Sequence, residues 1–586
     1  MCGIAGFIRR DGSSPDPAIL TRLADALAHR GPDGSGRHML GRTGMVQTRL
    51  AIIDLETGDQ PLHSKAGHAL AANGEIYNYK DLTRDLPPGS LATRSDCELP
   101  LALYGDRQEA GMDALRGMYA IALHDPQRDR VVLSRDPFGI KPLYIAETPE
   151  GIAFASEAAA LVEAGLVSRE LVPEKAVELL QLQFTTGAET PFRGVRRLLP
   201  GETLTIDGGH VVSRRMRAAL PDGPPETVSE ADALERLDQA LRDSVRVHLQ
   251  SDVGYGMFLS GGIDSSIVLA LIAQETGRSV QAFTAHFPDT GVADEQAAAA
   301  AMAKRFGAEQ VPIAFTADDF WSLLPQVAAA LDDPCADYAA LPTFKLAAAA
   351  AAEQKVVLTG EGGDELLAGY GRYRATMRPW WRGGKMPRAR GMMDRLGVLR
   401  TEDQSWRDGI QSAEIAVSTS GRSKLQVAQA LDCADWLPQD LLTKLDRCLM
   451  AHGLEGRTPF LDPVVAEAAF RLPDRLKVRG RLGKWVLRRY LEKLAPGAGA
   501  FERKRGFTVP VAEWIRGRGS TLSELVAGQE GVRALCNASA VPALFQASDK
   551  RAGQAAWALL FFALWHQIHI VGTKPGPSPE ETLTGF

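Results

Sequence analysis

A proline-dense stretch divides this chain into two parts whose residue patterns predict different folds. Residues 218–226 hold three prolines and a glycine and have little to bury. We therefore expect a linker over residues 216–228, a first domain over residues 2–215 and a second domain over residues 229–572. Residues 573–586 are polar and rich in proline, and we expect them to form a flexible tail.

The first part is rich in short runs of β-forming residues separated by Gly, Pro, Asp and Asn turn signals. Few helices stand out, the clearest over residues 17–29 and 99–104. This pattern predicts an α+β sandwich in which antiparallel sheets pack on each other with helices outside, in the layer order αββα. The expected strands cover residues 44–53, 69–72, 119–123, 131–133, 143–145, 152–155 and 203–206.

The second part alternates helical segments with short apolar strands, which is typical of a parallel α/β sheet covered by helices on both faces. We expect helices over residues 233–250 and 267–275, strands over 256–259, 280–286 and 356–358, and mostly helices beyond. Residues 555–565 are apolar, but this run is shorter than the roughly 20 residues that a membrane span needs. We therefore expect a buried helix there and no membrane partner.

Composition excludes several classes of protein. The chain has 586 residues, 45% hydrophobic and 24% charged, as in ordinary globular proteins. A net charge of −6 without a long Lys/Arg run argues against a nucleic-acid partner. None of the six cysteines lies in a Cys-x-x-Cys pair, and the opening lacks a basic and apolar leader, so we expect a cytoplasmic protein without structural zinc or disulfides. The assembly state is left open, a homodimer included.

The second residue of the chain is a cysteine, and its position gives it a specific chemistry. Removal of Met1 would leave Cys2 with a thiol and a free α-amine on the same residue. An α-amine has a pKa of about 7.7–8.0, so near neutral pH it can accept the thiol proton and act as general base. Cys2 is therefore a candidate nucleophile that needs no catalytic histidine.

Five motifs in the first hundred residues resemble the glutaminase domain of N-terminal-nucleophile amidotransferases. They are residues 1–6, 29–33, 49–54, 73–78 and 95–98. This resemblance implies hydrolysis of the glutamine side-chain amide through a thioester on Cys2, with release of ammonia. It also implies that Asn73 and Gly74 supply N–H donors to the tetrahedral oxyanion.

Free glutamine carries a carboxylate and an ammonium, so its recognition needs opposite charges at fixed places. By the same resemblance, Arg49 holds the carboxylate, and Glu75 and Asp96 hold the ammonium. Ile52 and Ile53 complete the expected glutamine site.

A glycine-containing loop joins an expected strand to an apolar helix in the second part. Two glycines let the backbone approach an anion, and hydroxyl and N–H groups at a helix N-terminus bind phosphate oxygens. The loop lacks the lysine of a Walker A sequence and resembles that of ATP pyrophosphatases, which split ATP into AMP and pyrophosphate. Its candidate ATP-binding residues are Leu259, Ser260, Gly261, Gly262, Asp264, Ser265 and Ser266.

About a hundred residues later, residues 356–365 repeat the design of a strand followed by a glycine loop, now with acids. Thr359 and Gly360 join the candidate ATP site. Mg²⁺ bound to ATP usually takes one or two carboxylates, and we expect these to be Asp264 and Asp364.

Motifs across the second part resemble the synthetase half of glutamine-hydrolysing asparagine synthetases. They include residues 332–334, 341–343, 446–462 and 484–488. The resemblance implies an ATP-pyrophosphatase fold of the adenine nucleotide α-hydrolase type with helical additions, and glutamine, aspartate and ATP as substrates. It links Glu361 to deprotonation of ammonium and Lys504 to stabilisation of charge at the phosphates. We also expect an apolar passage for ammonia between the two sites.

Three other functions compete with this interpretation. The same chemistry on another small-molecule or peptide carboxylate stays open, because the sequence does not locate the acceptor pocket. A sugar-phosphate amidotransferase would share only the first part, and the loop at Ser260–Ser266 argues against it. A non-catalytic binding protein would be expected to lose Cys2, Asp264 or Glu361, and all three are present.

Overall fold

The computed structural model describes residues 2–288, 295–401, 403–419, 421–502 and 509–585, and its first half contains two six-stranded antiparallel sheets. One sheet has the order β10-β8-β9-β1-β3-β2 and the other β12-β11-β7-β6-β5-β4. The strands are β1 Cys2–Arg9, β2 Gly34–Leu40, β3 Thr43–Arg49, β4 Leu62–His63, β5 Ala69–Ile76, β6 Gly117–Asp125, β7 Arg130–Arg135, β8 Tyr144–Thr148, β9 Gly151–Ala155, β10 Val195–Arg197, β11 Glu202–Asp207 and β12 His210–Met216.

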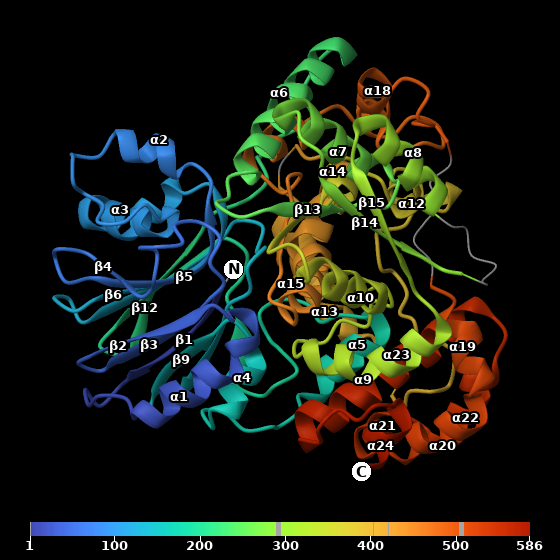
Figure 1. Ribbon diagram of the computed structural model, residues 1–586. Helices are drawn as coiled ribbons and strands as arrows, with labels where there is room; N and C mark the ends of the chain where they lie inside the picture. The colour runs from blue at the N-terminus through green and yellow to red at the C-terminus, as the bar shows by residue number, and fades with distance from the viewer. Residues whose placement is uncertain (1, 289–294, 402, 420, 503–508, 586) are drawn as a thin grey trace.

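The two sheets face each other, and helices cover their outer faces. Ile4, Leu133 and Phe154 belong to a fully buried apolar cluster shared by both sheets. Helix α1 (Pro17–Ala26) packs on β1 and β3, and α3 (Leu99–Arg107) packs on β5. The expected sandwich of antiparallel sheets with outer helices is therefore confirmed (Figure 1).

The second half is built on a five-stranded parallel sheet of order β15-β14-β13-β16-β17. Its strands are β13 Tyr255–Phe258, β14 Gln281–His286, β15 Glu309–Ala314, β16 Val356–Leu358 and β17 Glu455–Arg457. From β13 the chain builds outward through β14 to β15, and then returns to the other side of β13 with β16. In open α/β sheets, ligands bind beyond the carboxyl ends of the strands at such a change of direction.

Helices surround this sheet and fill the rest of the second half. Around the sheet lie α6 Glu230–His248, α7 Ile263–Thr276, α8 Gln296–Phe306, α9 Ala317–Ala330 and α10 Ala340–Ala351. The later chain adds, among others, α11 Gly363–Leu366, α12 Gly371–Thr376, the π-helix η6 Asp432–Leu442, α15 Thr443–Met450, α18 Trp485–Leu494, α23 Lys550–His566 and α24 Pro579–Thr584.

Two observations concern the C-terminal region. Residues 550–571 form the one described helix that is long and apolar enough to cross a membrane, but 78% of its most apolar window is buried inside the protein. It therefore has the surroundings of a core helix, as expected for residues 555–565. The expectation of a flexible tail is wrong: residues 579–584 form α24, because Thr582 and Leu583 are buried against the neighbouring helices.

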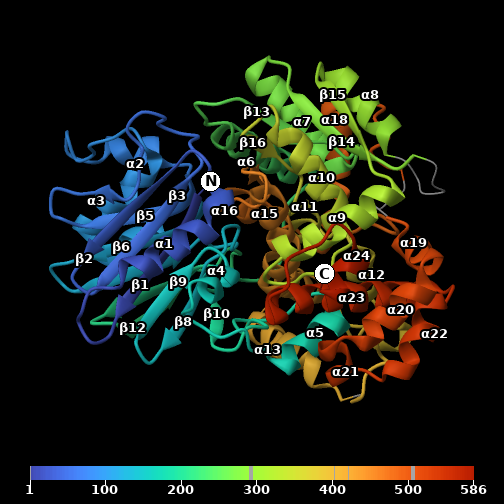
Figure 2. The same ribbon diagram turned by 60° about the horizontal axis from the view of Figure 1, so that its bottom comes forward.

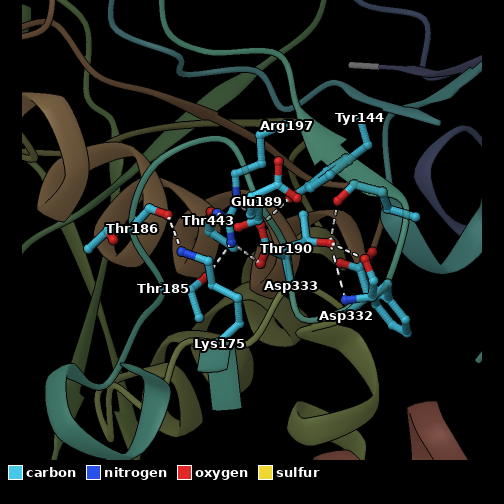
Figure 3. Close-up of polar contacts among 12 residues, drawn as sticks. Tyr144, Lys175, Thr185, Thr186, Glu189, Thr190, Arg197, Asp332, Asp333 and Thr443 are labelled. Atoms are coloured by element: carbon cyan, nitrogen blue, oxygen red, sulfur yellow. Dashed lines mark hydrogen bonds and ion pairs between the residues drawn. The ribbon is translucent and has the colours of Figure 1, made fainter. Parts of the chain in front are cut away.

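Besides the coil at residues 217–229, helix packing and buried polar contacts connect the two halves. Helix α5 (Pro173–Leu182) comes from the first half of the sequence, yet it packs against α23 of the second half (Figure 2). Beside it, Arg197 of β10 forms a buried ion pair with Asp333, with Nε to Oδ2 at 2.6 Å, and Tyr144 donates to the same carboxylate at 2.8 Å (Figure 3). These contacts fix the position of one catalytic half relative to the other.

Candidate active sites

Cys2 lies at the start of β1, where the backbone pairs with β3. The register places Cys2 opposite Arg49, and the Cys2 side chain is buried. Burial raises the pKa of the Cys2 thiol above its usual value. A thiol in this position needs a base beside it, and the α-amine of a processed Cys2 would meet that need.

Asn73 has the geometry of an oxyanion donor. Its Oδ1 accepts a hydrogen bond from the Cys2 backbone N–H at 3.1 Å, which fixes the orientation of the amide. The Nδ2 atom of Asn73 is buried and finds no acceptor among the described residues. Gly74 follows with φ +152°, and a Cβ there would lie 2.0 Å from the Met118 carbonyl oxygen, so only glycine fits. A buried donor without an acceptor beside the thiol suits a transient negative oxygen.

Arg49, which we expect to bind the carboxylate of glutamine, already forms two contacts within the protein. Arg49 Nη1 contacts Asp59 Oδ1 at 2.6 Å, and Nη2 donates to the Asp54 carbonyl oxygen at 2.5 Å. The Asp59 side chain is 86% exposed, so a bound carboxylate can compete for Nη1. Ile52 and Ile53 belong to the loop after β3; strand β3 ends at Arg49 rather than at residue 53.

The two expected ammonium partners lie close to each other and to the second half. Asp96 Oδ2 accepts from the Ile76 backbone N–H at 2.6 Å, and Glu75 Oε1 lies 3.3 Å from Arg457 Nη2 of β17. Burial raises the pKa of Asp96 to about 6. Burial and the nearby Glu455 also raise the pKa of Glu75. Because a cation favours the ionised form of a carboxyl, the ammonium of glutamine would reverse these shifts.

We expect glutamine to bind less tightly at acid pH. Protonated Asp96 cannot pair with an ammonium, so affinity is full above pH 6 and falls as the pH drops through that value. With a pKa of about 6 for Asp96, the Kd should rise about tenfold between pH 7 and pH 5. Calorimetry on the Cys2→Ala variant measures this without turnover. An unchanged pH dependence in a Cys2→Ala, Asp96→Asn double variant would contradict the assignment.

The candidate phosphate loop lies at the carboxyl end of β13. Ser260 Oγ contacts Ser265 Oγ at 3.1 Å, and the Gly262 N–H donates to Ser260 Oγ at 3.3 Å. Gly261 has φ +67°, and a Cβ there would lie 2.8 Å from the Ala299 backbone nitrogen. Leu259 is buried below the loop, and Ser265 and Ser266 begin the buried part of α7. The loop presents hydroxyl and N–H groups at a helix N-terminus, as phosphate binding requires.

The acidic loop after β16 packs directly against this phosphate loop. Gly360 approaches so closely that a Cβ would lie 2.9 Å from Asp264 Cβ, and Thr359 donates its N–H to the Arg457 carbonyl oxygen at 2.8 Å. Pairing of β13 with β16 brings the two loops to one sheet edge. The structure therefore brings together all the expected ATP-binding residues on these loops.

Lys484 joins the two expected metal-binding carboxylates and was not identified from the sequence. Its Nζ contacts Asp264 Oδ2 and lies 2.9 Å from Asp364 Oδ1. Although burial opposes it, the two carboxylates raise the pKa of Lys484, so it is charged. Two carboxylates from different loops thus converge on one cation. The motif at residues 484–488 was the only signal for this lysine, because it is 220 residues from Asp264 in the chain.

Glu361 stands beside this cluster. Burial raises the pKa of Glu361 against the opposing charge of Lys444, and Asp364 adds to the increase. Lys444 was also missed; its Nζ pairs with Asp337 Oδ2 at 2.7 Å. A carboxyl with a raised pKa is suited to accept a proton near neutral pH. The expected Lys504 lies outside the described residues.

A candidate thiol nucleophile in one half and a candidate phosphate loop in the other are the parts that a glutamine-dependent ligase needs. Family comparisons agree with both halves: residues 1–216 match the glutamine amidotransferase domain and residues 236–567 match asparagine synthase. The chain belongs to the asparagine synthase family and is a carbon–nitrogen ligase.

Curated relatives match along nearly the whole chain. A Mycobacterium bovis relative is 33% identical over 97% of each chain. The glutamine-hydrolysing asparagine synthetase 1 of Bacillus subtilis strain 168 is 30% identical over 97% of each chain. The glutamine-hydrolysing asparagine synthetase B of Escherichia coli K12 is 29% identical over 90% of this chain and 85% of its own.

Proposed function

We propose that this enzyme converts aspartate to asparagine with ammonia taken from glutamine. ATP activates the side-chain carboxylate as β-aspartyl-AMP and pyrophosphate leaves. Ammonia released at Cys2 then displaces AMP. The observation that carries the proposal is the convergence of Asp264 and Asp364 on one cation beside the phosphate loop.

The residues present fit a magnesium–nucleotide complex. Mg²⁺ prefers oxygen ligands and is commonly held by one or two carboxylates together with phosphate oxygens. Asp264 and Asp364 would hold it, and the ion would neutralise charge on the phosphates. Lys484 supports the same role, because its ammonium, held between these carboxylates, would add positive charge beside the phosphates. Glu361 would take the proton from ammonium before attack.

An apolar contact between the halves supports transfer of ammonia away from bulk water. Leu50 and Ile52 of the glutaminase loop pack with Val356 of β16 and Met450 of α15 in one buried cluster. This cluster joins the loop after β3 to the strand that leads into Thr359 and Glu361. Uncharged ammonia crosses apolar surroundings at a lower cost in desolvation free energy than an ammonium ion does.

Acceptor identity is tested by a panel of carboxylic acids. With ATP and Mg²⁺ present, aspartate should release pyrophosphate at least about 10²-fold faster than glutamate. One extra methylene contributes roughly 10–200-fold and also misplaces the reacting carboxylate. Pyrophosphate release is followed with a coupled assay, and the other nucleotide product should be AMP. Release with another acid, and none above background with aspartate, would reject aspartate as the acceptor.

A further inference from the structure

A cavity lined by arginines shares none of its described lining residues with either proposed site. It has a volume of about 430 Å³, and four of its ten described lining residues are Arg372, Arg388, Arg390 and Arg551. None of the ten is acidic. A volume of this size is within the range of small-molecule sites, roughly 300–1,000 Å³. The cavity can therefore hold an organic molecule and has the charge to select an anionic one.

Five separate segments build the walls of the cavity. Gln181 and Leu182 come from α5, Arg372 from α12, Arg388 and residues 390–392 from the coil that follows, Trp436 from η6, and Arg551 and Gln554 from α23. The coil is fixed to its neighbours: the Met393 N–H donates to Gln181 Oε1 at 2.9 Å, and the Met392 N–H donates to the Gln181 carbonyl oxygen at 2.9 Å. These two hydrogen bonds attach the coil to α5.

The arginines are held in position by the protein. Arg372 and Arg388 share the buried carboxylate of Asp432, with contacts of 2.8 Å and 2.6 Å. Both guanidinium groups also stack on the Trp436 ring, at 5.0 Å and 4.8 Å from its centroid. Arg551 Nε donates to the Met392 carbonyl oxygen at 3.2 Å. Ordered guanidinium groups lose little freedom when they bind an anion, which favours affinity.

The lining carries four arginines and no acidic residue. Behind it, Asp432 pairs with Arg372 and Arg388, Asp394 accepts from the Gly391 N–H at 3.0 Å and from Gln181 Nε2 at 3.2 Å, and the buried Asp435 and Asp440 of η6 also lie near Arg388. Two lining donors, Arg388 Nη2 and Trp436 Nε1, are buried and have no acceptor among the described residues.

We propose that this cavity binds a small molecule that carries a compact dianion, either a phosphate ester or a pair of carboxylates. Arginine forks suit both groups, because each presents paired oxygens to paired N–H donors. Arg372 connects the cavity to the candidate nucleotide site: its guanidinium lies 3.9 Å from the Tyr370 ring centroid, and the Tyr370 hydroxyl donates to Glu365 Oε1 at 2.6 Å. Glu365 directly follows Asp364. The inference does not depend on which carboxylate the enzyme amidates.

The test is calorimetric titration of the full-length protein with inorganic phosphate and, separately, with succinate. A non-hydrolysable ATP analogue and Mg²⁺ are kept saturating, so that the phosphate loop at Ser260–Ser266 is occupied. We expect saturable binding of at least one dianion at one site per chain, weakened by added salt. The tighter of the two probes identifies the source of the dianion.

Variants separate this cavity from other sites. Arg390→Gln removes an exposed guanidinium, and Arg551→Lys keeps the charge but loses the fork; each should raise the Kd of the dianion about tenfold, since hydrogen bonds to charged groups are strong. The matched control is Arg395→Gln, an exposed arginine of the same coil outside the lining, which should leave the Kd within about twofold. Thermal unfolding and glutamine hydrolysis check that each variant is folded.

The absence of saturable binding by both probes would overturn the proposal. Equal affinity in the parent, Arg390→Gln and Arg551→Lys proteins would also overturn it, because the dianion would then bind elsewhere. Neither result would bear on asparagine formation, which is measured independently.

Discussion

Replacing Cys2 with alanine is expected to lower glutamine-dependent product formation by at least about 10⁴-fold, because the variant has no nucleophile to form the thioester. Formation from added ammonium salt should change less than about twofold, since the thiol acts only in releasing ammonia. Both rates are measured on the same preparation by product analysis. Their separation follows from the structure, in which Cys2 and the phosphate loop belong to different halves of the chain.

A second buried cysteine of the same half provides the matched control for this variant. Cys97 Sγ donates to the Gly74 carbonyl oxygen at 3.5 Å, so it is close to the proposed oxyanion donors. Cys97→Ala should retain glutamine-dependent activity within about tenfold, because it removes only a weak hydrogen bond and a small apolar volume. Equal loss of the glutamine-dependent and ammonium-dependent rates in Cys2→Ala would contradict the two-site account.

Replacing Asp264 or Asp364 should strongly slow pyrophosphate release, which is the half-reaction assigned to the second half of the chain. Asp264→Asn or Asp364→Asn is expected to lower pyrophosphate release by at least about 10³-fold, because charge stabilisation by a bound metal contributes several kcal/mol. The Mg²⁺ concentration needed for half-maximal rate should also rise. Glutamine hydrolysis by either variant, followed by glutamate formation, should stay within a few-fold of the parent rate.

An exposed aspartate of the same half serves as the control. Asp318→Asn on α9 should leave both half-reactions unchanged, since this side chain is exposed and lies on a different element. If Asp264→Asn and Asp364→Asn lose activity without any change in Mg²⁺ requirement, the carboxylates serve to position Lys484 and not to hold the ion. That outcome would reject the proposed metal site.

Local sequence patterns predicted several strands of each sheet and the loops after two of them, whereas β1, β2, β10, β12 and β15 were not among the expected strands. The strand at residues 356–358 was predicted with its observed limits, because three β-branched and aliphatic residues lie between polar neighbours. The phosphate loop was located because glycines and hydroxyls follow directly after an apolar strand. Such signals are short in sequence, and the parallel sheet then brings their strand ends together.

Features that depend on distant partners were not visible in the sequence. β17 consists of Glu455, Gly456 and Arg457, and these residues have no apolar pattern that would predict a buried strand. The strand can be buried because the charges of Glu455 and Arg457 pair with each other. Lys484 lies far along the chain from the carboxylates it joins. The tail looked disordered by composition, but the burial of Leu583 outweighs its polar and proline-rich surroundings. Tertiary contacts decided each of these cases.

The central claim is that ATP activates the side-chain carboxylate of aspartate by transferring AMP to it with loss of pyrophosphate, and an isotope measurement tests it most directly. Aspartate labelled with ¹⁸O in its side-chain carboxylate is incubated with enzyme, ATP, Mg²⁺ and glutamine, and the products are analysed by mass spectrometry. If the carboxylate attacks the α-phosphorus, one ¹⁸O atom must appear in AMP, the pyrophosphate must be unlabelled, and asparagine must retain the other. Label in inorganic phosphate, or asparagine formed without label in AMP, would contradict the account.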